Sequence, residues 1–295
     1  MAKPNLLIVG AAKSGTTSLH NYLNQHNDVF MCNPKEPHFL INNEIGIQRI
    51  PIGISNKIAY EKLFLEGEGL KYRGESSVMY LMYPEIVIPK IKEHLGSEVK
   101  IVIMLRNPVE RAYSGYQHVK RYNIKEDILE FRDAWDVSEQ RYFSNPDMTP
   151  ASRYKELGLY YNQVKSYLEN FNTHIIIYED YKLDFQNEMN KVFDFLEINR
   201  MEINSEQQHM VGGWQWQNQK VKSLMTRKNL LKSFLKVIIP SKAMRKLIRQ
   251  KIQDRNSADV PPISIEDKNM LKDYYKDDVR QLSELLGRDL NYWTK

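Results

Sequence analysis

The stretch LLIVGAAKSGTTSL, residues 6–19, decides how this chain of 295 residues folds. Residues 6–9 are an apolar run typical of a buried strand, and small residues and then an amphipathic helical pattern follow. A strand, a tight turn and a helix N-terminus form an anion site, because backbone N–H groups converge there and the helix end carries about half a positive charge. The turn therefore predicts a phosphate-like ligand. The residues expected to hold it are Lys13, Ser14, Gly15, Thr16, Thr17 and Ser18.

The position of the lysine separates two kinds of phosphate loop. In the P-loop of nucleotide triphosphatases, GxxxxGK[ST], the lysine follows the second glycine and the next hydroxyl binds magnesium. Here Gly10 and Gly15 have that separation, but Thr16 follows Gly15 and the lysine lies inside the loop, at Lys13. A kinase that uses ATP and magnesium is therefore an alternative hypothesis and not the preferred one.

A second apolar run, residues 99–105, predicts a central parallel strand. Arg106 follows it, then the helix breaker Asn107-Pro108, then a helix that carries Ser114. An arginine offers a planar fork of donors to a phosphate, and a hydroxyl on the first turns of the next helix can complete the cage. Arg106 and Ser114 are therefore candidates for a second phosphate site.

The two elements in this order resemble those of sulfotransferases that use 3′-phosphoadenosine 5′-phosphosulfate (PAPS). In that family the KSGTT-type loop binds the 5′-phosphosulfate, and the arginine and serine bind the 3′-phosphate. The resemblance implies an α/β fold, a P-loop-like central parallel β-sheet flanked by helices, in a single domain over residues 1–295. It also implies PAPS as co-substrate and no metal.

The segment KEPHF, residues 35–39, is similar to one that carries the catalytic glutamate in carbohydrate-type and bacterial sulfotransferases. The resemblance makes Glu36 the general base. His38 is the rival, because an unperturbed histidine pKa near 6.5 suits that role. Lys13 is the expected partner of the leaving group, since its compact charge lies in the donor loop. Lys35 is either a guide for the sulfonate or acceptor or a surface lysine.

The chain departs from the glycosaminoglycan sulfotransferases at residues 74–77. Those enzymes have a lysine after the glutamate, whereas this chain has Glu75-Ser76-Ser77. The change removes a positive charge from the expected cluster, which argues against a sulfated glycan recognised in the animal manner. It also makes Glu75 a second candidate base. The KTHLP-type segment of cytosolic arylsulfotransferases is absent, so the chain resembles bacterial members whose acceptors include saccharides, lipids and secondary metabolites.

Composition is that of an ordinary globular protein, with 42% hydrophobic residues and a net charge of +5. No apolar run approaches the ~20 residues that span a bilayer, and we expect no signal peptide before the first strand. The single cysteine, Cys32, excludes an intramolecular disulfide and favours a reducing cytoplasm. No nucleic-acid motif accompanies the charge, so we expect no nucleic-acid partner.

Residues 219–253 contain 11 Lys or Arg and no Asp or Glu, together with several large apolar residues. One interpretation is a solvated helical face. A second is a lid, over residues 219–255, from which Lys220 or Lys222 reaches the 3′-phosphate. A third is peripheral attachment to an anionic membrane surface. Trp214 and Trp216, just before this segment, fit an aromatic clamp over a ligand and a packed core pair equally well.

Two loops, residues 42–57 and 145–152, are expected to border the acceptor site, since ligands of open α/β sheets lie at the carboxyl ends of the strands. The sequence thus predicts a PAPS-dependent sulfotransferase acting on a hydroxyl or amine of a small natural product or a saccharide. A kinase using ATP and magnesium and a non-catalytic nucleotide-binding protein are the alternatives. The acceptor, the choice between O- and N-sulfation and the oligomeric state are not predicted.

Overall fold

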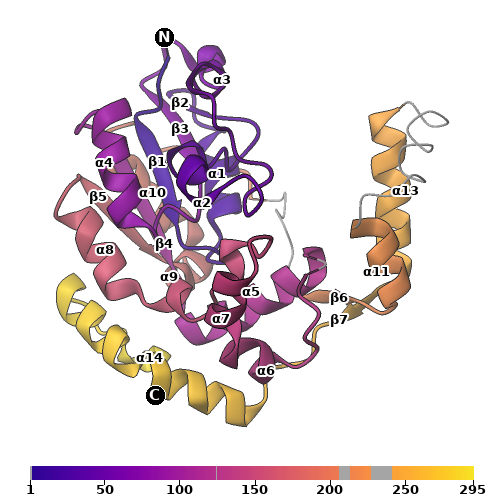
Figure 1. Ribbon diagram of the computed structural model, residues 1–295. Coiled ribbons are helices and arrows are strands. Elements are labelled where there is room, and N and C mark those ends of the chain that lie inside the picture. Colours follow the sequence, from indigo (N-terminus) through magenta and orange to yellow (C-terminus); the bar gives the residue numbers. More distant parts are fainter. Residues whose placement is uncertain (1, 124, 206–212, 227–240) are drawn as a thin grey trace.

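A central sheet of five parallel strands organises the computed structural model, which describes residues 2–123, 125–205, 213–226 and 241–295 (Figure 1). The strand order is β2-β3-β1-β4-β5. In the register, Leu6 pairs with Gly74 on one side and with Lys100 on the other. The predicted α/β fold with a parallel sheet is confirmed. The strands are β1 (Leu6–Gly10), β2 (Val29–Met31), β3 (Tyr72–Ser76), β4 (Lys100–Leu105) and β5 (Thr173–Ile177).

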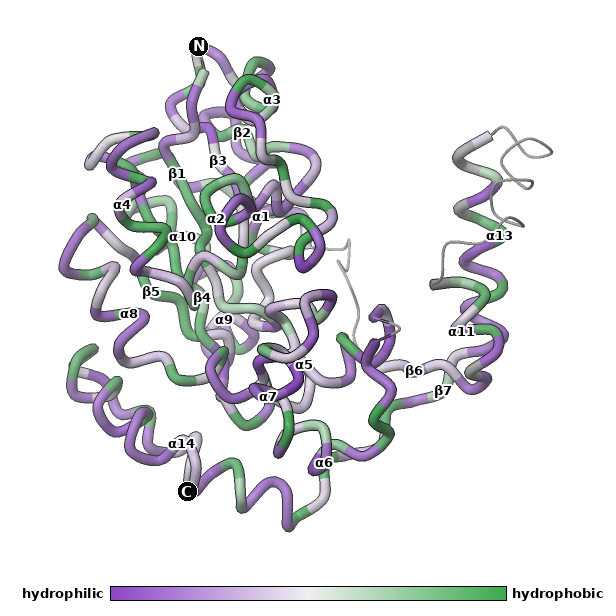
Figure 2. Tube along the Cα trace, viewed as in Figure 1, coloured by the Kyte–Doolittle hydropathy of each residue, from purple (hydrophilic) through white to green (hydrophobic). Residues whose placement is uncertain are grey.

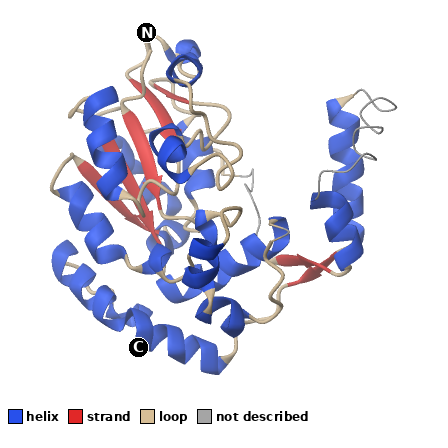
Figure 3. Ribbon diagram, viewed as in Figure 1, coloured by secondary structure: helices blue, strands red, loops and turns tan. Residues whose placement is uncertain are grey.

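Both faces of the sheet are covered by helices, which explains why the central strands are apolar over residues 6–9 and 101–105 (Figures 2 and 3). In β1, Leu6 and Ile8 enter one hydrophobic cluster, while Leu7 and Val9 enter the cluster on the opposite face. The first cluster is closed by α1 (Thr16–Leu23), α9 (Tyr178–Leu183) and α10 (Phe185–Phe195). The second is closed chiefly by α2 (Phe39–Ile45), α4 (Pro84–His94), α5 (Pro108–Tyr122), α8 (Tyr160–Leu168) and α14 (Ile265–Leu286).

Shorter elements fill the connections between these helices. They are α3 (Lys57–Lys62), α6 (Phe131–Asp136), α7 (Ser138–Ser144) and four 3₁₀ turns, η1 (Leu65–Gly67), η2 (Pro150–Ser152), η3 (Glu156–Gly158) and η4 (Asn291–Trp293). Because the strands are parallel, the turns that follow β1, β3 and β4 all meet at one edge of the sheet. In the described part of the chain no helix is both long enough and apolar enough to span a bilayer.

An arm built from β6 (Trp214–Trp216), α11 (Gln219–Thr226), α13 (Lys242–Arg255) and β7 (Ser257–Asp259) stands away from the sheet (Figure 1). The antiparallel strands β6 and β7 join it to the rest of the chain. Residues 227–240 of the predicted basic segment lie outside the described residues. The rest of that segment, in α11 and α13, alternates between hydrophilic and hydrophobic residues (Figure 2).

The two tryptophans hold this arm against the end of α5. Trp216 is buried and its Nε1–H donates to the carbonyl oxygen of Arg121 at 3.2 Å. The guanidinium of Arg121 lies 4.4 Å from the centroid of the Trp214 ring, which also packs edge-on against Tyr122. Of the two interpretations of the tryptophan pair, the packed one matches this geometry.

The carboxyl-terminal turn η4 closes the cluster beneath α5 and α8. Trp293 is 1% exposed and packs edge-on against Tyr160, and its carbonyl oxygen accepts from the Nδ2–H of Asn107 at 3.3 Å. Its neighbour Tyr292 is 46% exposed.

Replacing Trp293 by alanine therefore empties a fully packed position at the end of the chain. We expect Trp293→Ala to lower the free energy of unfolding by about 3–5 kcal/mol, the range for a large buried aromatic residue. Tyr292→Ala, the matched control at the exposed neighbour, is expected to change it by about 0.5 kcal/mol. Urea unfolding followed by circular dichroism measures both. Equal losses in the two variants would contradict the packing described for η4.

Candidate functional site

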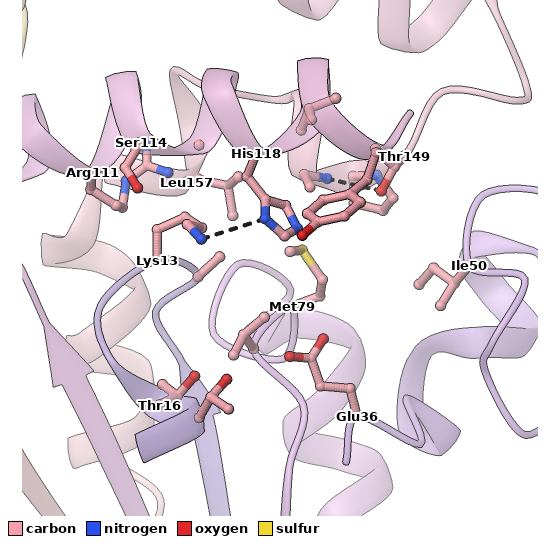
Figure 4. Close-up of a pocket in the computed structure, with 18 of the residues that line it drawn as sticks. Lys13, Thr16, Glu36, Ile50, Met79, Arg111, Ser114, His118, Thr149 and Leu157 are labelled. Atoms are coloured by element: carbon pink, nitrogen blue, oxygen red, sulfur yellow. Dashed lines mark hydrogen bonds between the residues drawn. The ribbon is translucent and has the colours of Figure 1, made fainter. Parts of the chain in front are cut away.

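A cavity of about 700 Å³ opens at the carboxyl edge of the sheet (Figure 4). The turn after β1, the segment before α2, the inner face of α5 and two long loops contribute its walls. Among the predicted residues, those that line it are Lys13, Gly15, Thr16, Thr17, Ser18, Glu36, His38, Arg106 and Ser114.

The turn after β1 exposes the beginning of α1 to this cavity. Gly15, at the N-cap of α1, has φ of +94°, and no side chain caps the first turn of the helix. A β-carbon at this position would lie 3.0 Å from the ring of Tyr178, so both the backbone angle and the space require glycine. The turn thus presents the first N–H groups of α1, with the hydroxyls of Thr16 and Thr17, to a ligand.

Lys13 is held at the centre of the cavity wall by α5 and by the end of β4. The Nη1–H of Arg106 donates to the Lys13 carbonyl oxygen at 3.3 Å. The Lys13 ammonium lies 3.4 Å from Nδ1 of His118 (Figure 4). Burial, with repulsion from Arg121 and Arg106, lowers the pKa of Lys13 to about 8. Burial and the charge of Lys13 lower the pKa of His118 to about 4, so a neutral imidazole accepts from the lysine.

Glu36 faces the cavity, and His38 lies behind it. The side chain of Glu36 is 28% exposed and that of His38 is 4% exposed; His38 Nε2 is 3.2 Å from a Glu36 carboxylate oxygen. Lys35 donates to the other oxygen at 2.5 Å. Burial opposes the charged form of Glu36, but Lys35 and His38 outweigh it and hold the pKa of the carboxyl well below its ordinary value. Glu36 is therefore an ionised acceptor at neutral pH.

Glu75 supports this segment from below. It has no exposed surface, and its carboxylate accepts from the hydroxyls of Tyr60 at 2.5 Å, Ser77 at 2.6 Å and Tyr80 at 3.1 Å. Ser77 Oγ in turn accepts the backbone N–H of His38 at 3.0 Å. Burial raises the pKa of Glu75. As a candidate base Glu75 is badly placed, because it lies under the turn that carries Glu36 and His38 and does not line the cavity.

The second cluster of cationic donors lies at the start of α5. Arg106 stacks on Tyr178, with the guanidinium carbon 5.1 Å from the ring centroid, and reaches Glu110 at 4.0 Å. One turn further, Arg111 is fully buried and donates to the carbonyl oxygen of Tyr154 at 2.7 Å. Ser114 follows on the same face and lines the cavity beside Arg111 (Figure 4). Two donor clusters thus face one cavity.

Comparison with known proteins identifies the family. Residues 3–255 match the profile described as the sulfotransferase domain. The chain belongs to the sulfotransferase domain family. A crystal structure of a sulfotransferase from Alicyclobacillus acidocaldarius has the same fold, with a TM-score of 0.74 and 27% identity over 100% of both chains.

Among curated relatives, human carbohydrate sulfotransferase 15 is 22% identical, with 98% of this chain and 54% of the relative covered. The human bifunctional heparan sulfate N-deacetylase/N-sulfotransferase 1 is 25% identical, with 99% and 31% covered. The worm enzyme of the latter name, from Caenorhabditis elegans, is 27% identical over 60% of this chain and 20% of its own length. The chain thus spans about half or less of the length of these relatives.

Three residues predicted for the donor site do not line the cavity of this sulfotransferase domain. Ser14 is buried beneath the turn. Lys220 is exposed on α11, where its backbone N–H donates to Oδ1 of Asn218. Lys222 is 8% exposed, and burial and the nearby charge of Lys120 lower its pKa. The contribution of these lysines to the 3′-phosphate site stays a prediction.

Residues that the sequence analysis missed complete the cavity. His118 lies on the face of α5 that carries Arg111 and Ser114. It follows them by seven and four residues, and this helical spacing could have identified it from the sequence. Met79 enters from the turn after β3. The two loops expected near the acceptor do reach the cavity, through residues 48–52 and 147–151.

The depressed pKa of Lys13 is directly measurable. The neutral amine, and not the ammonium, attacks acylating reagents, so labelling of Lys13 should rise with pH and reach half its maximum at about pH 8, whereas an ordinary lysine does so near pH 10.4. Peptide mass spectrometry after brief labelling at several pH values gives the profile. A midpoint near 10.4 would mean that Lys13 is not desolvated among cations.

Proposed function

We propose that this protein transfers the sulfuryl group of PAPS to a hydroxyl or amine of a small-molecule or saccharide acceptor. The observation that carries the proposal is one cavity bordered by the turn of Lys13, by the Arg106–Ser114 cluster and by the carboxylate of Glu36. A co-substrate with two separate phosphate groups needs two clusters of hydrogen-bond donors. The base that takes the proton of the acceptor has to lie between these clusters and the acceptor.

PAPS fits this set of groups at both of its phosphate ends. The turn of residues 13–18 and the first N–H groups of α1 suit the 5′-phosphosulfate. Arg106 and Ser114 suit the 3′-phosphate, because both residues line the same cavity and supply a guanidinium and a hydroxyl. The kinase hypothesis is weaker, since the lysine lies within the loop and not behind its second glycine.

The reaction is an in-line transfer. The acceptor oxygen or nitrogen forms a bond to sulfur, and the bond between sulfur and the bridging phosphate oxygen breaks. That oxygen leaves with the electron pair in 3′-phosphoadenosine 5′-phosphate (PAP), and the acceptor proton goes to a carboxylate oxygen of Glu36. Lys13 stabilises the charge that grows on the leaving oxygen, which is the role of a preorganised cation in such transfers.

The low pKa of Glu36 suits this reaction, because the carboxylate orients the O–H or N–H of the substrate that accepts the sulfuryl group. In a loose transition state the nucleophile loses its proton late, after its own acidity has risen, so a base of high pKa is not required. Lys35 and His38 hold the carboxylate in place, and the exposed part of Glu36 receives the acceptor's O–H or N–H. His38, at 4% exposure, acts as the positioning residue.

Some finer properties belong to the same proposal. We propose a reducing compartment such as the cytoplasm, because the single cysteine, Cys32, can form no intramolecular disulfide. We also propose one domain over residues 1–295 with the basic arm as an accessory element. Within this proposal, the acceptor is a product of secondary metabolism.

The first test is calorimetric titration with PAP in the absence of magnesium, followed by competition with ATP and magnesium. We expect micromolar binding of PAP that ATP with magnesium does not displace. Arg106→Ala is expected to weaken PAP binding by about 1.5–3 kcal/mol, the cost of losing a charged hydrogen bond. Preference for ATP with magnesium would overturn the proposal and restore the kinase alternative. PAP binding without transfer to any acceptor would leave the non-catalytic alternative.

Two substitutions separate catalysis from donor binding. We expect Lys13→Ala to lower turnover by about 100-fold or more, because one preorganised charge is lost at the leaving oxygen. Glu36→Gln should also lower turnover while PAP affinity stays near that of the natural chain, since the base does not hold the donor. Single-turnover transfer of radioactive sulfate measures both. Full turnover in either variant would remove that residue from the assigned role.

A further inference from the structure

The cavity has two ends of different chemistry. The donor end carries Lys13, Arg111 and Ser114, and the second end lies around Ile50. Figure 4 shows Lys13, Arg111 and Ser114 on one side and Ile50 on the other, with Met79 and Glu36 between them. The wall around Ile50 comes from residues 48–52, 78–79 and 147–151. Its apolar members are Ile50, Pro51, Ile52, Val78, Met79 and Pro150.

The charged groups at this end are engaged with the protein itself. Arg49 donates from Nη1 to the carbonyl oxygen of Met148 at 3.0 Å, and its guanidinium carbon lies 3.9 Å from the centroid of the Tyr142 ring. It therefore ties the two loops of the wall together. Asp147 pairs with Lys125 at 3.3 Å. Glu36 adds a carboxylate at the boundary between the two ends.

A polyanionic acceptor is poorly matched to such a wall. Its charged groups would lose water against apolar side chains and would approach the carboxylate of Glu36, and the cation of this wall, Arg49, is already engaged with Met148 and Tyr142. An uncharged apolar body would gain instead where it covers the exposed side chains of Pro51 and Ile52, while Ile50, Val78 and Met79, at 5–7% exposure, form the packed backing of the wall. Ile52, 69% exposed at the rim of the cavity, offers the clearest gain.

We propose that the acceptor is an uncharged alcohol or amine attached to an apolar body, such as an alkyl chain or a hydrophobic ring, that lies against this wall. The inference rests on the proposed sulfuryl transfer. The reacting O–H or N–H meets Glu36 at the boundary between the two ends, while the apolar body covers Met79, Ile50 and Ile52. Arg49 acts as a positioning residue that fixes the shape of the wall.

The test uses alkyl β-D-glucosides with chains from methyl to octyl, below their micelle-forming concentrations, titrated into the PAP-saturated protein by calorimetry. Affinity should rise with chain length, by up to about fourfold for each methylene that becomes buried. A sulfated heparin oligosaccharide, the polyanionic competitor, should bind more weakly than octyl glucoside. Transfer of radioactive sulfate to the same glucosides should follow the same order.

Two exposed isoleucines of one loop provide matched variants. Ile52 lines the cavity, whereas Ile47, 60% exposed, lies outside its lining. Ile52→Asp should weaken octyl glucoside binding by about tenfold or more and flatten the dependence on chain length. Ile47→Asp should keep that dependence, and PAP affinity should be the same in both variants.

The possible failures are distinguishable. If PAP binds but affinity does not depend on chain length, or the sulfated oligosaccharide binds more tightly than octyl glucoside, the apolar acceptor is wrong and the sulfuryl transfer stands. If Ile52→Asp and Ile47→Asp behave alike, the wall is not the binding surface. If PAP itself does not bind, the proposed function fails and this inference fails with it.

Discussion

Positive charge gathered at one turn is the constraint on which the rest of the site depends. Lys13 is half-buried near Arg106 and Arg121, and desolvation and repulsion outweigh the attraction of Glu36, so that the pKa of Lys13 is lowered to about 8. Glu110 reaches Arg106 at 4.0 Å, which is too long for a strong ion pair. An anion in the cavity would relieve this repulsion. The fold thus keeps at this turn an electrostatic cost that a bound anion would reduce.

The parallel sheet keeps these positive charges close together by fixing the backbone beneath them. Residues of β1 and β4 are fully buried on both faces, so the turns that follow them have little freedom to move apart. The contact between Arg106 and the Lys13 carbonyl oxygen joins the two turns directly. On the other side of the cavity, Glu75 and Ser77 fix His38, and His38 fixes Glu36. The cationic groups and the Glu36 carboxylate are therefore held by different strands of one sheet.

The elements that could be predicted from sequence are those with short-range signals. The apolar runs of β1 and β4, the turn of residues 13–18 and the arginine at the end of β4 are local features, and the structure brings them together because the strands are neighbours. The surroundings of Glu75 could not be predicted, since its three hydroxyl partners come from α3 and from the turn after β3. The tryptophan pair was ambiguous for the same reason: its partner is the distant end of α5.

The difference between the two ends of the cavity follows from how each is built. The end that carries Lys13, Arg106 and Ser114 consists of strand ends and helix starts, whose backbone geometry the sheet determines. The end around Ile50 consists of loops that the sheet does not determine, and Arg49 joins these loops by a hydrogen bond to Met148 and by stacking on Tyr142. Side chains on such loops can change without disturbing the buried strands. Similarity to relatives at 22–27% identity therefore carries information about the fold, whereas the chemistry of the end built from loops has to be derived from the wall of this chain itself.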